Sequence, residues 1–323
     1  MSFEGIEEAY DRIKNIVNKT PVMTSRSLNK ITGAYVYLKC ENFQRVGAFK
    51  FRGAYNALSQ LSDEEKKHGV ITHSSGNHAQ AVSLAASLLG IHATIVMPKG
   101  APQNKIDATK GYGAEIIFCD NTLEARTKTA GKIIAEKNFI LIHPFDNDYI
   151  INGQGTAAYE LIKEVGNLDV VITPLGGAGL LSGTAIATKG LCPNAQVFGV
   201  EPSVADDAYR SLQAGYIIPS TYPDTIADGL KTSISERTFK IIQKFVDGIL
   251  TVSEMEIIEA MKFLWERMKI VVEPSGAVPL SALLSKKIEV SNKKVGLIIS
   301  GGNIDIEPFL NLLKKKISDF KEN

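Results

Sequence analysis

The sequence predicts an α/β protein with two open, twisted, mostly parallel sheets and flanking helices. Short apolar runs, typical of buried strands, alternate with amphipathic stretches, typical of helices, along almost the whole chain. No internal repeat and no low-complexity linker interrupts this alternation. Because parallel strands are joined by crossover connections that are usually helical, the pattern indicates sheets covered by helices on both faces.

Nine apolar runs are the expected strands. In the first half of the chain they are residues 35–39, 69–75, 93–98, 114–120 and 139–144. In the second half they are residues 170–176, 196–202, 248–253 and 294–300. Helical stretches lie between them, for example 78–90, 102–113 and 122–137.

The rhythm of these elements predicts two domains. The compact series of strand–helix units over 69–146 is expected to form a small domain with its own sheet. Residues 1–68 and 147–323 would form a larger, discontinuous domain. The polar, glycine-bearing stretch 143–155 suits the crossing between them.

Composition excludes several classes of protein. The formal net charge of the 323 residues is +1, and the basic run 314–316 reads as a solvated helix face, so nucleic acid is not an expected partner. Three widely spaced cysteines argue against a disulfide framework and are expected to be buried. No signal-peptide core and no membrane-length apolar run is present. We therefore expect a cytoplasmic enzyme or binding protein.

The stretch "RVGAFKFRGA" places Lys50 between Phe49 and Phe51, with glycines nearby. A lysine in such an apolar setting has two interpretations. Its long side chain can extend to solvent from a packed helix start. Alternatively, its amine lies in a poorly solvated site, where a lowered pKa makes it a nucleophile.

The stretch "PLGGAGLLSG" predicts a strand end, a glycine-rich turn and a helix start. Gly176, Gly177 and Gly179 leave backbone N–H groups free to face an anion, and the helix dipole adds to this attraction. A dinucleotide fingerprint is incomplete, because Ser182 occupies its third glycine position and Gly183 comes one residue late. The turn therefore predicts a site for a single phosphate, with a ligand-free tight turn as the alternative.

A second strand-to-helix turn, "SSGNHAQA", brings together a hydroxyl-rich pair, an amide and an imidazole. These groups belong to Ser74, Ser75, Asn77 and His78. Ligands of open α/β sheets bind beyond the carboxyl ends of strands, which favours a binding role. The alternative is that Ser75 or Asn77 caps the following helix.

Two further strand ends carry polar side chains. Ser300 in "ISGGN" follows an apolar strand and either binds a ligand ring or starts a turn. Glu201, Asp206 and Asp207 in "EPSVADD" suit a hard cation such as Mg²⁺ or Ca²⁺, or the N-terminus of the next helix. The five histidines lack zinc-ligand spacing, and no G-x-S-x-G motif is present, so zinc and hydrolase sites are not expected.

A lysine, a phosphate site, an asparagine and a serine at strand ends form a set. Pyridoxal phosphate needs a lysine, a phosphate site and a partner for its ring nitrogen. The chain resembles the serine racemase and threonine dehydratase family of fold-type II pyridoxal-phosphate enzymes from about residue 5 to residue 305. The similarity implies a fold like that of the tryptophan synthase β subunit. It is carried by "GAFKFRGA", "HSSGNHAQA", "HPFD", "NGQGT", "PLGGAGLLSG", "VEPSVADDAY", "TIADGLK", "VVEPSGA" and "ISGGN".

The resemblance implies roles for these residues. Lys50 would carry the cofactor covalently, Phe49 would pack against its ring, and Asn77 would bind its phenolic oxygen. Ser300 would face the ring nitrogen and, unlike an aspartate, would leave it mostly unprotonated. The phosphate would lie on Gly176, Gly177, Ala178 and Gly179, with alanine where many relatives have a fourth glycine.

Ser75 is the informative position within this family. Serine racemases typically show "SSGNH" and threonine-type dehydratases "SAGNH", although some 3-hydroxyaspartate dehydratases share the serine. Racemisation needs acid–base groups on both faces of the substrate α-carbon, and Lys50 and Ser75 would supply them. Ser74, His78 and Arg126 would contact the amino-acid substrate, with a solvated helix position as the alternative for Arg126.

The resemblance also implies ligands beyond pyridoxal phosphate. Glu201, Asp207 and the carbonyl of Ala205 match the family's divalent-cation site, for Mg²⁺, Ca²⁺ or Mn²⁺. ATP as an activator and a homodimer rest on the resemblance alone. The expected activity is serine racemisation with dehydration of serine to pyruvate and ammonia. The alternatives are a threonine or 3-hydroxyaspartate dehydratase with little racemase activity and a ligand-binding module without covalent chemistry.

Overall fold

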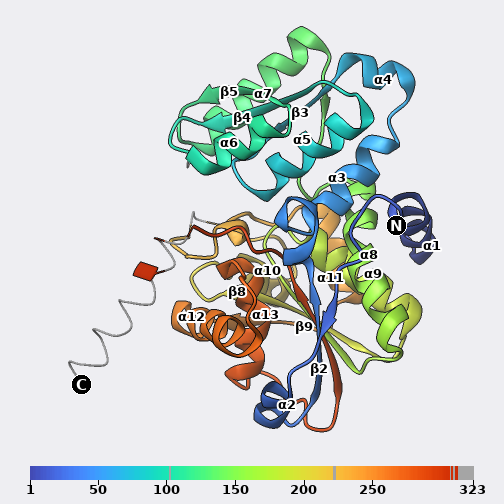
Figure 1. The fold of residues 1–323 in the computed structure, drawn as a ribbon, viewed down its shortest axis with the longest axis vertical. Coiled ribbons are helices and arrows are strands. Elements are labelled where there is room, and N and C mark those ends of the chain that lie inside the picture. The colour runs from blue at the N-terminus through green and yellow to red at the C-terminus, as the bar shows by residue number, and fades with distance from the viewer. Residues whose placement is uncertain (102, 221–222, 306, 308–309, 312–323) are drawn as a thin grey trace.

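Two sheets organise the chain in the computed structural model, which describes residues 1–323 except 102, 221–222, 306, 308–309 and 312–323. Each sheet lies in its own lobe, and the two lobes are stacked along the long axis of the molecule (Figure 1). The basic run 314–316, expected to be a solvated helix face, lies outside the described residues.

The larger sheet has six strands in the order β1-β2-β10-β7-β8-β9. All neighbours are parallel except β1, which pairs antiparallel with β2 at one edge. The carboxyl ends of the parallel strands therefore meet at one edge of the sheet. The strands are β1 (Val22–Met23), β2 (Tyr35–Cys40), β10 (Lys294–Ile299), β7 (Val170–Pro174), β8 (Gln196–Pro202) and β9 (Gly248–Val252).

Helices cover both faces of this sheet. One face packs on α2 (Arg26–Thr32), α12 (Glu254–Phe263) and α13 (Pro274–Leu284). The other face packs on α1 (Phe3–Ile13), α8 (Asp148–Val165), α9 (Gly179–Leu191), α10 (Asp207–Ala214) and α11 (Glu236–Phe245). Short 3₁₀ segments η1 (Glu41–Phe43), η2 (Arg45–Gly47) and η3 (Asp228–Leu230), and a π-helical turn η4 (Leu264–Met268), complete this lobe.

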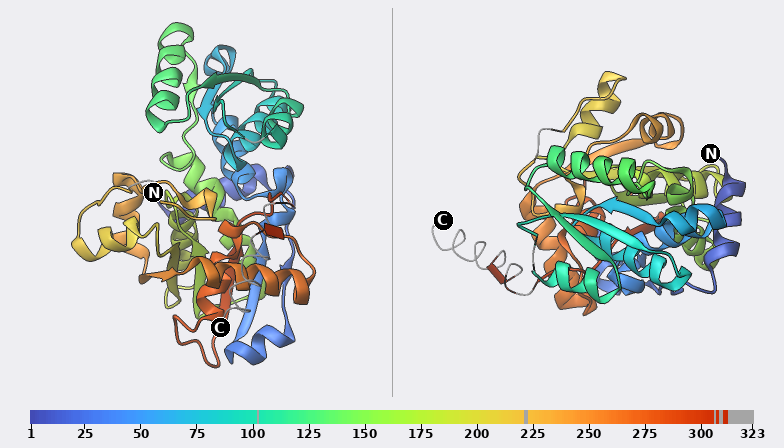
Figure 2. Two further views of the ribbon diagram at one scale, coloured as in Figure 1. Left: turned by 90° about the vertical axis from the view of Figure 1, so that its left-hand side faces the viewer. Right: turned by 90° about the horizontal axis from the view of Figure 1, so that it is seen from above.

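The smaller sheet is wholly parallel, with the order β5-β4-β3-β6. Its strands are β5 (Glu115–Cys119), β4 (Ala93–Pro98), β3 (Val70–His73) and β6 (Ile140–Leu141). One face packs on α3 (Lys50–Ser59), α5 (Asn77–Leu89) and α6 (Gln103–Gly111), and the other on α7 (Leu123–Lys137). The short α4 (Asp63–His68) leads into β3, and α3 lies where the two lobes meet (Figures 1 and 2).

The predicted fold class is confirmed, and a strand overlaps each of the nine expected runs. The sequence did not indicate β1, because two residues at an antiparallel edge are too short to show a period. The three cysteines are buried and unpaired, as expected. None of the helices in the described residues has the length and apolar character needed to cross a membrane.

Candidate active site

Lys50 is the first residue of α3, and the backbone before it is tied to the end of β10. Val46 and Gly47 adopt positive φ angles of 55° and 68°, which turn the chain toward that strand. Ala48 then forms a bridge with Gly301, and the Phe49 N–H donates to the carbonyl of Ser300 over 3.0 Å. The lysine is therefore held at the carboxyl end of the larger sheet, where ligands of such sheets bind.

The amine of Lys50 points into the region between the lobes. Its Nζ donates to the carbonyl oxygen of Pro144 over 2.9 Å and lies 5.1 Å from the ring centroid of Phe49. Burial lowers the pKa of Lys50 to about 8, although the nearby Glu273 carboxylate opposes this shift. A lysine that loses its proton near neutral pH is suited to nucleophilic chemistry. The interpretation of Lys50 as an extended surface side chain is not supported.

The glycine-rich turn lies between β7 and α9, at the same edge of the sheet. Ala178 adopts a left-handed conformation (φ 65°, ψ 13°) and is the N-cap of α9, where the described residues supply no side-chain cap. A β-carbon on Gly177 would overlap the ring of Phe145. The first N–H groups of α9 thus remain available to an anion, and the tight packing leaves no room for larger side chains.

Asn77 begins α5 and joins the two lobes. Its amide nitrogen donates to both carboxylate oxygens of Glu273, at 2.9 and 3.1 Å, and its amide oxygen accepts a hydrogen bond from Asn303 over 2.9 Å. Burial and the charge of Asp228 raise the pKa of Glu273 to about 8. The sequence motif "VVEPSGA" contains Glu273, but a contact across 196 residues has no local signal.

Ser300 follows β10 directly, as predicted, and its side chain is buried. Its carbonyl receives the Phe49 N–H, whereas its hydroxyl makes no hydrogen bond within the described part of the chain. A hydroxyl without a protein partner at this strand end is suited to a ligand nitrogen, because it can donate a hydrogen bond to that nitrogen.

The "SSGNH" turn follows β3, with Ser74 and Ser75 half-buried. Helix α5 has Gly76 as its N-cap and no side-chain cap, so the capping interpretation of Ser75 and Asn77 is wrong. The Ser74 hydroxyl accepts a hydrogen bond from the Gly76 N–H over 3.3 Å, and the Ser75 hydroxyl has no partner among the described residues. The turn therefore offers a hydroxyl and uncapped N–H groups to a ligand.

His78 lies one residue into α5 and is buried beside the lysine. Its Nε2 donates to the carbonyl of Ile142 over 3.0 Å, since a carbonyl only accepts, and its Nδ1 has no partner among the described residues. Burial, and then the charge of Lys50, lower the pKa of His78 to about 3, so the ring is neutral. This interaction shows that the start of α5 lies close to the lysine.

Arg126 projects from α7 toward the end of β3. Its side chain is half-buried, and its Nε atom is enclosed without a partner in the described structure. The pKa of His73 is lowered mainly by burial and next by the charge of Arg126, so the two side chains are neighbours. The solvated alternative for Arg126 is therefore weakened, and its guanidinium could receive a substrate carboxylate.

Glu201 and Asp207 come together at the end of β8. The carboxylate of Glu201 accepts from the N–H groups of Ala208 and Tyr209 at 3.3 and 2.9 Å, which also serves the N-terminus of α10. Asp207 Oδ2 is buried without a partner among the described residues. Burial raises the pKa of Asp207 to about 6, and burial and then Asp207 raise that of Glu201 well above its usual value.

Two buried carboxylates with raised pKa values suit a divalent cation, which would favour their charged forms. No cluster of three or more His, Cys, Asp or Glu side chains that could hold a metal occurs in the described residues. A cation here would therefore need backbone oxygen, such as the carbonyl of the buried Ala205, or solvent. The donor set fits Mg²⁺ or Ca²⁺ and would not suit a thiolate-bound metal.

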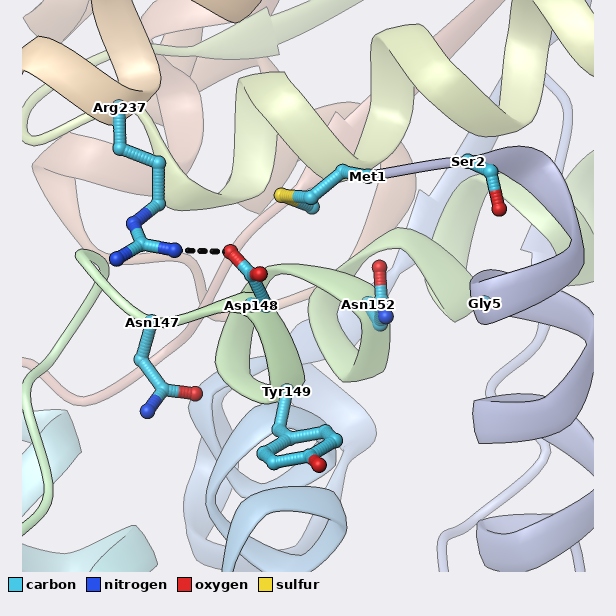
Figure 3. Close-up of a pocket in the computed structure, with 8 residues that line it drawn as sticks. All are labelled: Met1, Ser2, Gly5, Asn147, Asp148, Tyr149, Asn152 and Arg237. Atoms are coloured by element: carbon cyan, nitrogen blue, oxygen red, sulfur yellow. Dashed lines mark hydrogen bonds and ion pairs between the residues drawn. The ribbon is translucent and has the colours of Figure 1, made fainter.

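An open hollow of about 420 Å³ lies away from these residues (Figure 3). It is bounded by the N-termini of α1 and α8 and by Arg237 of α11, which pairs with Asp148. None of the predicted site residues lines it. The side chains that fit a cofactor gather instead at the strand ends between the lobes.

Known proteins are similar to this chain in sequence. A model of the family "pyridoxal-phosphate dependent enzyme" matches residues 13–301. The chain is 52% identical to the L-threo-3-hydroxyaspartate ammonia-lyase of Saccharomyces cerevisiae, over 98% of this chain and 97% of that one. It is 49% identical to the serine racemase of Schizosaccharomyces pombe, over 97% of this chain and 98% of that one.

Solved structures agree with this similarity. The crystal structure of serine racemase from Dictyostelium discoideum has a TM-score of 0.91 and 49% identity, over 95% of this chain and 99% of that chain. The crystal structure of maize serine racemase has a TM-score of 0.93 and 41% identity, over 99% of both chains. This chain therefore belongs to the family of pyridoxal-phosphate-dependent enzymes and has the fold of its type II members.

Proposed function

We propose that this enzyme interconverts L- and D-serine and also dehydrates serine, releasing pyruvate and ammonia. The observation that carries the proposal is the proximity of Lys50 to the start of α5, which begins two residues after Ser75. The charge of Lys50 helps to lower the pKa of His78. The next residue toward Ser75, Asn77, is hydrogen-bonded to Glu273, whose charge opposes the lowering of the Lys50 pKa. Relatives named serine racemase are 45–49% identical to the chain.

The residues present fit pyridoxal phosphate. Lys50 would hold the cofactor covalently, with Phe49 beside the ring. The uncapped turn of Gly176, Gly177, Ala178 and Gly179 would bind the phosphate through backbone N–H groups. Asn77 would bind the ring oxygen, and the unpaired hydroxyl of Ser300 would meet the ring nitrogen. When bound, the cofactor would supply an electron-withdrawing ring that stabilises negative charge on the substrate α-carbon.

Two side chains would move the α-proton. Lys50, with its lowered pKa, would take or return the proton on one face of the α-carbon. The Ser75 hydroxyl would do so on the other face, which an alanine there could not. Ser74, the uncapped start of α5 and His78 would hold the substrate. Loss of the β-hydroxyl as water, followed by hydrolysis of the dehydrated amino acid, would give pyruvate and ammonia.

A second candidate is a 3-hydroxyaspartate ammonia-lyase with little racemase activity. Two observations favour it: the 52% identity to such an enzyme and the partly enclosed Arg126 beside His73. A dicarboxylic substrate carries a second carboxylate, and a guanidinium is well suited to bind it. A threonine dehydratase stays a third possibility within the same chemistry.

Several further properties stay predictions. A divalent cation would bind Glu201, Asp207 and the carbonyl of Ala205. ATP as an activator and a homodimer rest on the family resemblance, and a cytoplasmic location and the domain limits at 69 and 146 rest on the sequence. None of them is needed for the proton transfers assigned above.

The test is product analysis from L-serine, D-serine, L-threonine and L-threo-3-hydroxyaspartate, with and without Mg²⁺. We expect the Ser75→Ala variant to lose racemisation by about a hundredfold or more, because one of two acid–base groups is gone. Dehydration of one enantiomer of serine, the one whose α-proton faces Lys50, should persist, since it needs only one proton abstraction. If Ser75→Ala racemises L-serine as fast as the parent, the two-base assignment is wrong.

Arg126→Gln separates the two candidates. An enzyme for 3-hydroxyaspartate should show a KM for that substrate at least about tenfold higher, because a charge-assisted hydrogen bond is lost. Its KM for serine should change little. Borohydride reduction followed by peptide mapping should place the cofactor on Lys50. A protein that takes up no pyridoxal phosphate would contradict both candidates.

A further inference from the structure

Helix α8 is wedged between the helix that carries the lysine and the helix that carries the phosphate turn. On one side, a β-carbon on Gly153 would lie 2.6 Å from the carbonyl oxygen of Arg52 and 2.8 Å from the Cα of Gly53, both in α3. On the other side, a β-carbon on Gly155 would lie 2.7 Å from the carbonyl oxygen of Gly183 in α9. Backbone atoms cannot move aside as side chains do, so these contacts fix how closely the three helices approach.

The glycines here serve this close approach. None of Gly53, Gly153, Gly155 and Gly183 has a positive φ angle, so their backbone conformations are open to any residue. Their common property is the absence of a side chain at a helix contact. The segment Gly153–Gly155 thus holds α8 at a set distance from both catalytic elements.

Gln154 lies inside this junction and is fully buried. Its Nε2 donates to the carbonyl oxygen of Pro144 over 3.3 Å, the same oxygen that accepts the Lys50 amine over 2.9 Å. Because a carbonyl only accepts, this contact orients the amide and directs Oε1 the other way. Oε1 has no partner in the described structure and is 2.6 Å from where a β-carbon on Gly179 would lie.

We infer that Gln154 is a positioning residue for the Lys50 amine. Its hydrogen bond to the Pro144 carbonyl keeps that carbonyl beside the Lys50 amine, and its unpaired oxygen lies beside Gly179, the first residue of α9. The Gln154 side chain thereby connects the carbonyl that accepts the Lys50 amine to the start of α9, which follows the phosphate turn. This inference rests on the proposed role of Lys50 but not on the identity of the substrate.

The competing explanation is that Gln154 only fills space. The two explanations predict different relative affinities of the cofactor-free protein for pyridoxal phosphate and for an analogue. Pyridoxamine 5′-phosphate has the ring and phosphate of pyridoxal phosphate but no aldehyde, so it cannot join covalently to a lysine. The ratio of the pyridoxal phosphate affinity to the pyridoxamine phosphate affinity therefore measures capture by Lys50 alone. Damage to the fold would weaken binding of both ligands equally and leave the ratio unchanged.

The experiment measures both affinities by fluorescence titration of the full-length cofactor-free chain, for the parent, Gln154→Met, Lys50→Ala and the double variant. Gln154→Met should lower the affinity ratio about fivefold, the effect of one net hydrogen bond, with the pyridoxamine phosphate affinity nearly unchanged. Lys50→Ala should abolish the preference, and adding Gln154→Met to it should have no further effect on the ratio.

Thr184→Val is the matched control. It removes another buried side-chain oxygen without a described partner, on α9, and should leave the ratio unchanged. Gln154→Asn, whose side chain is shorter by one methylene, should lower the ratio as Gln154→Met does. It replaces Gln154→Met in the test if that variant does not fold. An unchanged ratio in Gln154→Met, while Lys50→Ala abolishes it, overturns the role of Gln154. A preference that survives Lys50→Ala overturns instead the assignment of Lys50 and, with it, this inference.

Discussion

The amine of Lys50 donates a hydrogen bond to the carbonyl oxygen of Pro144 over 2.9 Å, across 94 residues of sequence. This contact joins the first residue of α3 to the segment that leads into α8. Burial at this place lowers the pKa of Lys50 to about 8, against an ordinary value of 10.5. The same environment that orients the amine therefore also makes it reactive near neutral pH.

The first prediction concerns covalent capture of pyridoxal phosphate by the cofactor-free protein. Only the neutral amine attacks an aldehyde, so the capture rate should rise with pH and level off above the lysine pKa. We expect a midpoint at about 8 in stopped-flow absorbance. A rate that keeps rising toward about pH 10, as for an ordinary lysine, would contradict the lowered pKa.

A second prediction concerns divalent cations and the pair Glu201 and Asp207. The folded-state pKa values of both carboxyls are raised, and Asp207 reaches about 6 from 3.8. The folded chain thus holds more protons than the unfolded chain in that window, and this pair lowers stability as the pH rises through it. A cation that binds the charged carboxylates should remove this loss.

Thermal unfolding with and without Mg²⁺ or Ca²⁺ checks this expectation. The increase in Tm should be larger at about pH 7.5 than at about pH 5, because protons compete with the cation at the lower pH. Asp207→Asn should remove most of the increase, whereas a change at the exposed Asp63 should not. An equal increase at both pH values would argue for binding elsewhere.

Much of the fold could be predicted because the spacing of apolar residues that marks strands and helices is visible within short stretches of sequence. A strand overlaps each of the nine apolar runs, and the rule that ligands bind beyond the carboxyl ends of strands points to Ser75, Gly177 and Ser300 from the sequence alone. Capping of α5 by Ser75 or Asn77 was not predictable in the same way. It depends on the conformation of Gly76, which takes the N-cap position itself.

The sequence could not show contacts between distant segments. Glu273 meets Asn77 across 196 residues, and Lys105 of α6 pairs with Asp228 of η3 across 123 residues. The Pro144 acceptor is a backbone atom, so no residue type signals it. Gln154 stands between two glycines, but only the packing of three helices shows why those glycines are needed.

A third prediction concerns Ala178 in the phosphate turn. Its left-handed conformation (φ 65°, ψ 13°) costs an alanine about 1 kcal/mol, which glycine avoids. Ala178→Gly should therefore raise the free energy of unfolding by up to about 1 kcal/mol in urea denaturation. The affinity for pyridoxal phosphate should change little, because the backbone N–H is kept.

Gly179→Ala is the contrasting variant in the same turn. Its β-carbon would lie 2.6 Å from Gln154 Oε1 and 2.8 Å from the Cβ of Phe145. We expect it to weaken binding of pyridoxal phosphate and pyridoxamine phosphate alike. Loss of binding in Ala178→Gly, or none in Gly179→Ala, would show that the turn does not hold the phosphate in this conformation.

The last prediction concerns a buried ionic cluster whose arginine lies close to Lys50 in the sequence. Arg52, two residues after Lys50, donates to both carboxylates of the cluster, Glu41 and Glu160, over 2.7–2.9 Å. The Lys39 amine donates to Glu160 over 2.7 Å, and all four side chains of the cluster are buried. Two cations and two anions balance, so removal of one leaves an uncompensated buried charge.

Lys39→Met should therefore lower the free energy of unfolding by about 3 kcal/mol, and Arg52→Met by about 3–5 kcal/mol. The double variant Lys39→Met/Glu160→Gln restores the balance and should lose about 1–2 kcal/mol less than the sum of its single changes. Lys66→Met, which breaks a surface pair with Asp63, should cost at most about 0.5 kcal/mol. Strict additivity of Lys39 and Glu160 in urea denaturation would mean that charge balance does not stabilise the cluster. The helix start at Lys50 would then be held by packing on α8 rather than by the ion pairs behind it.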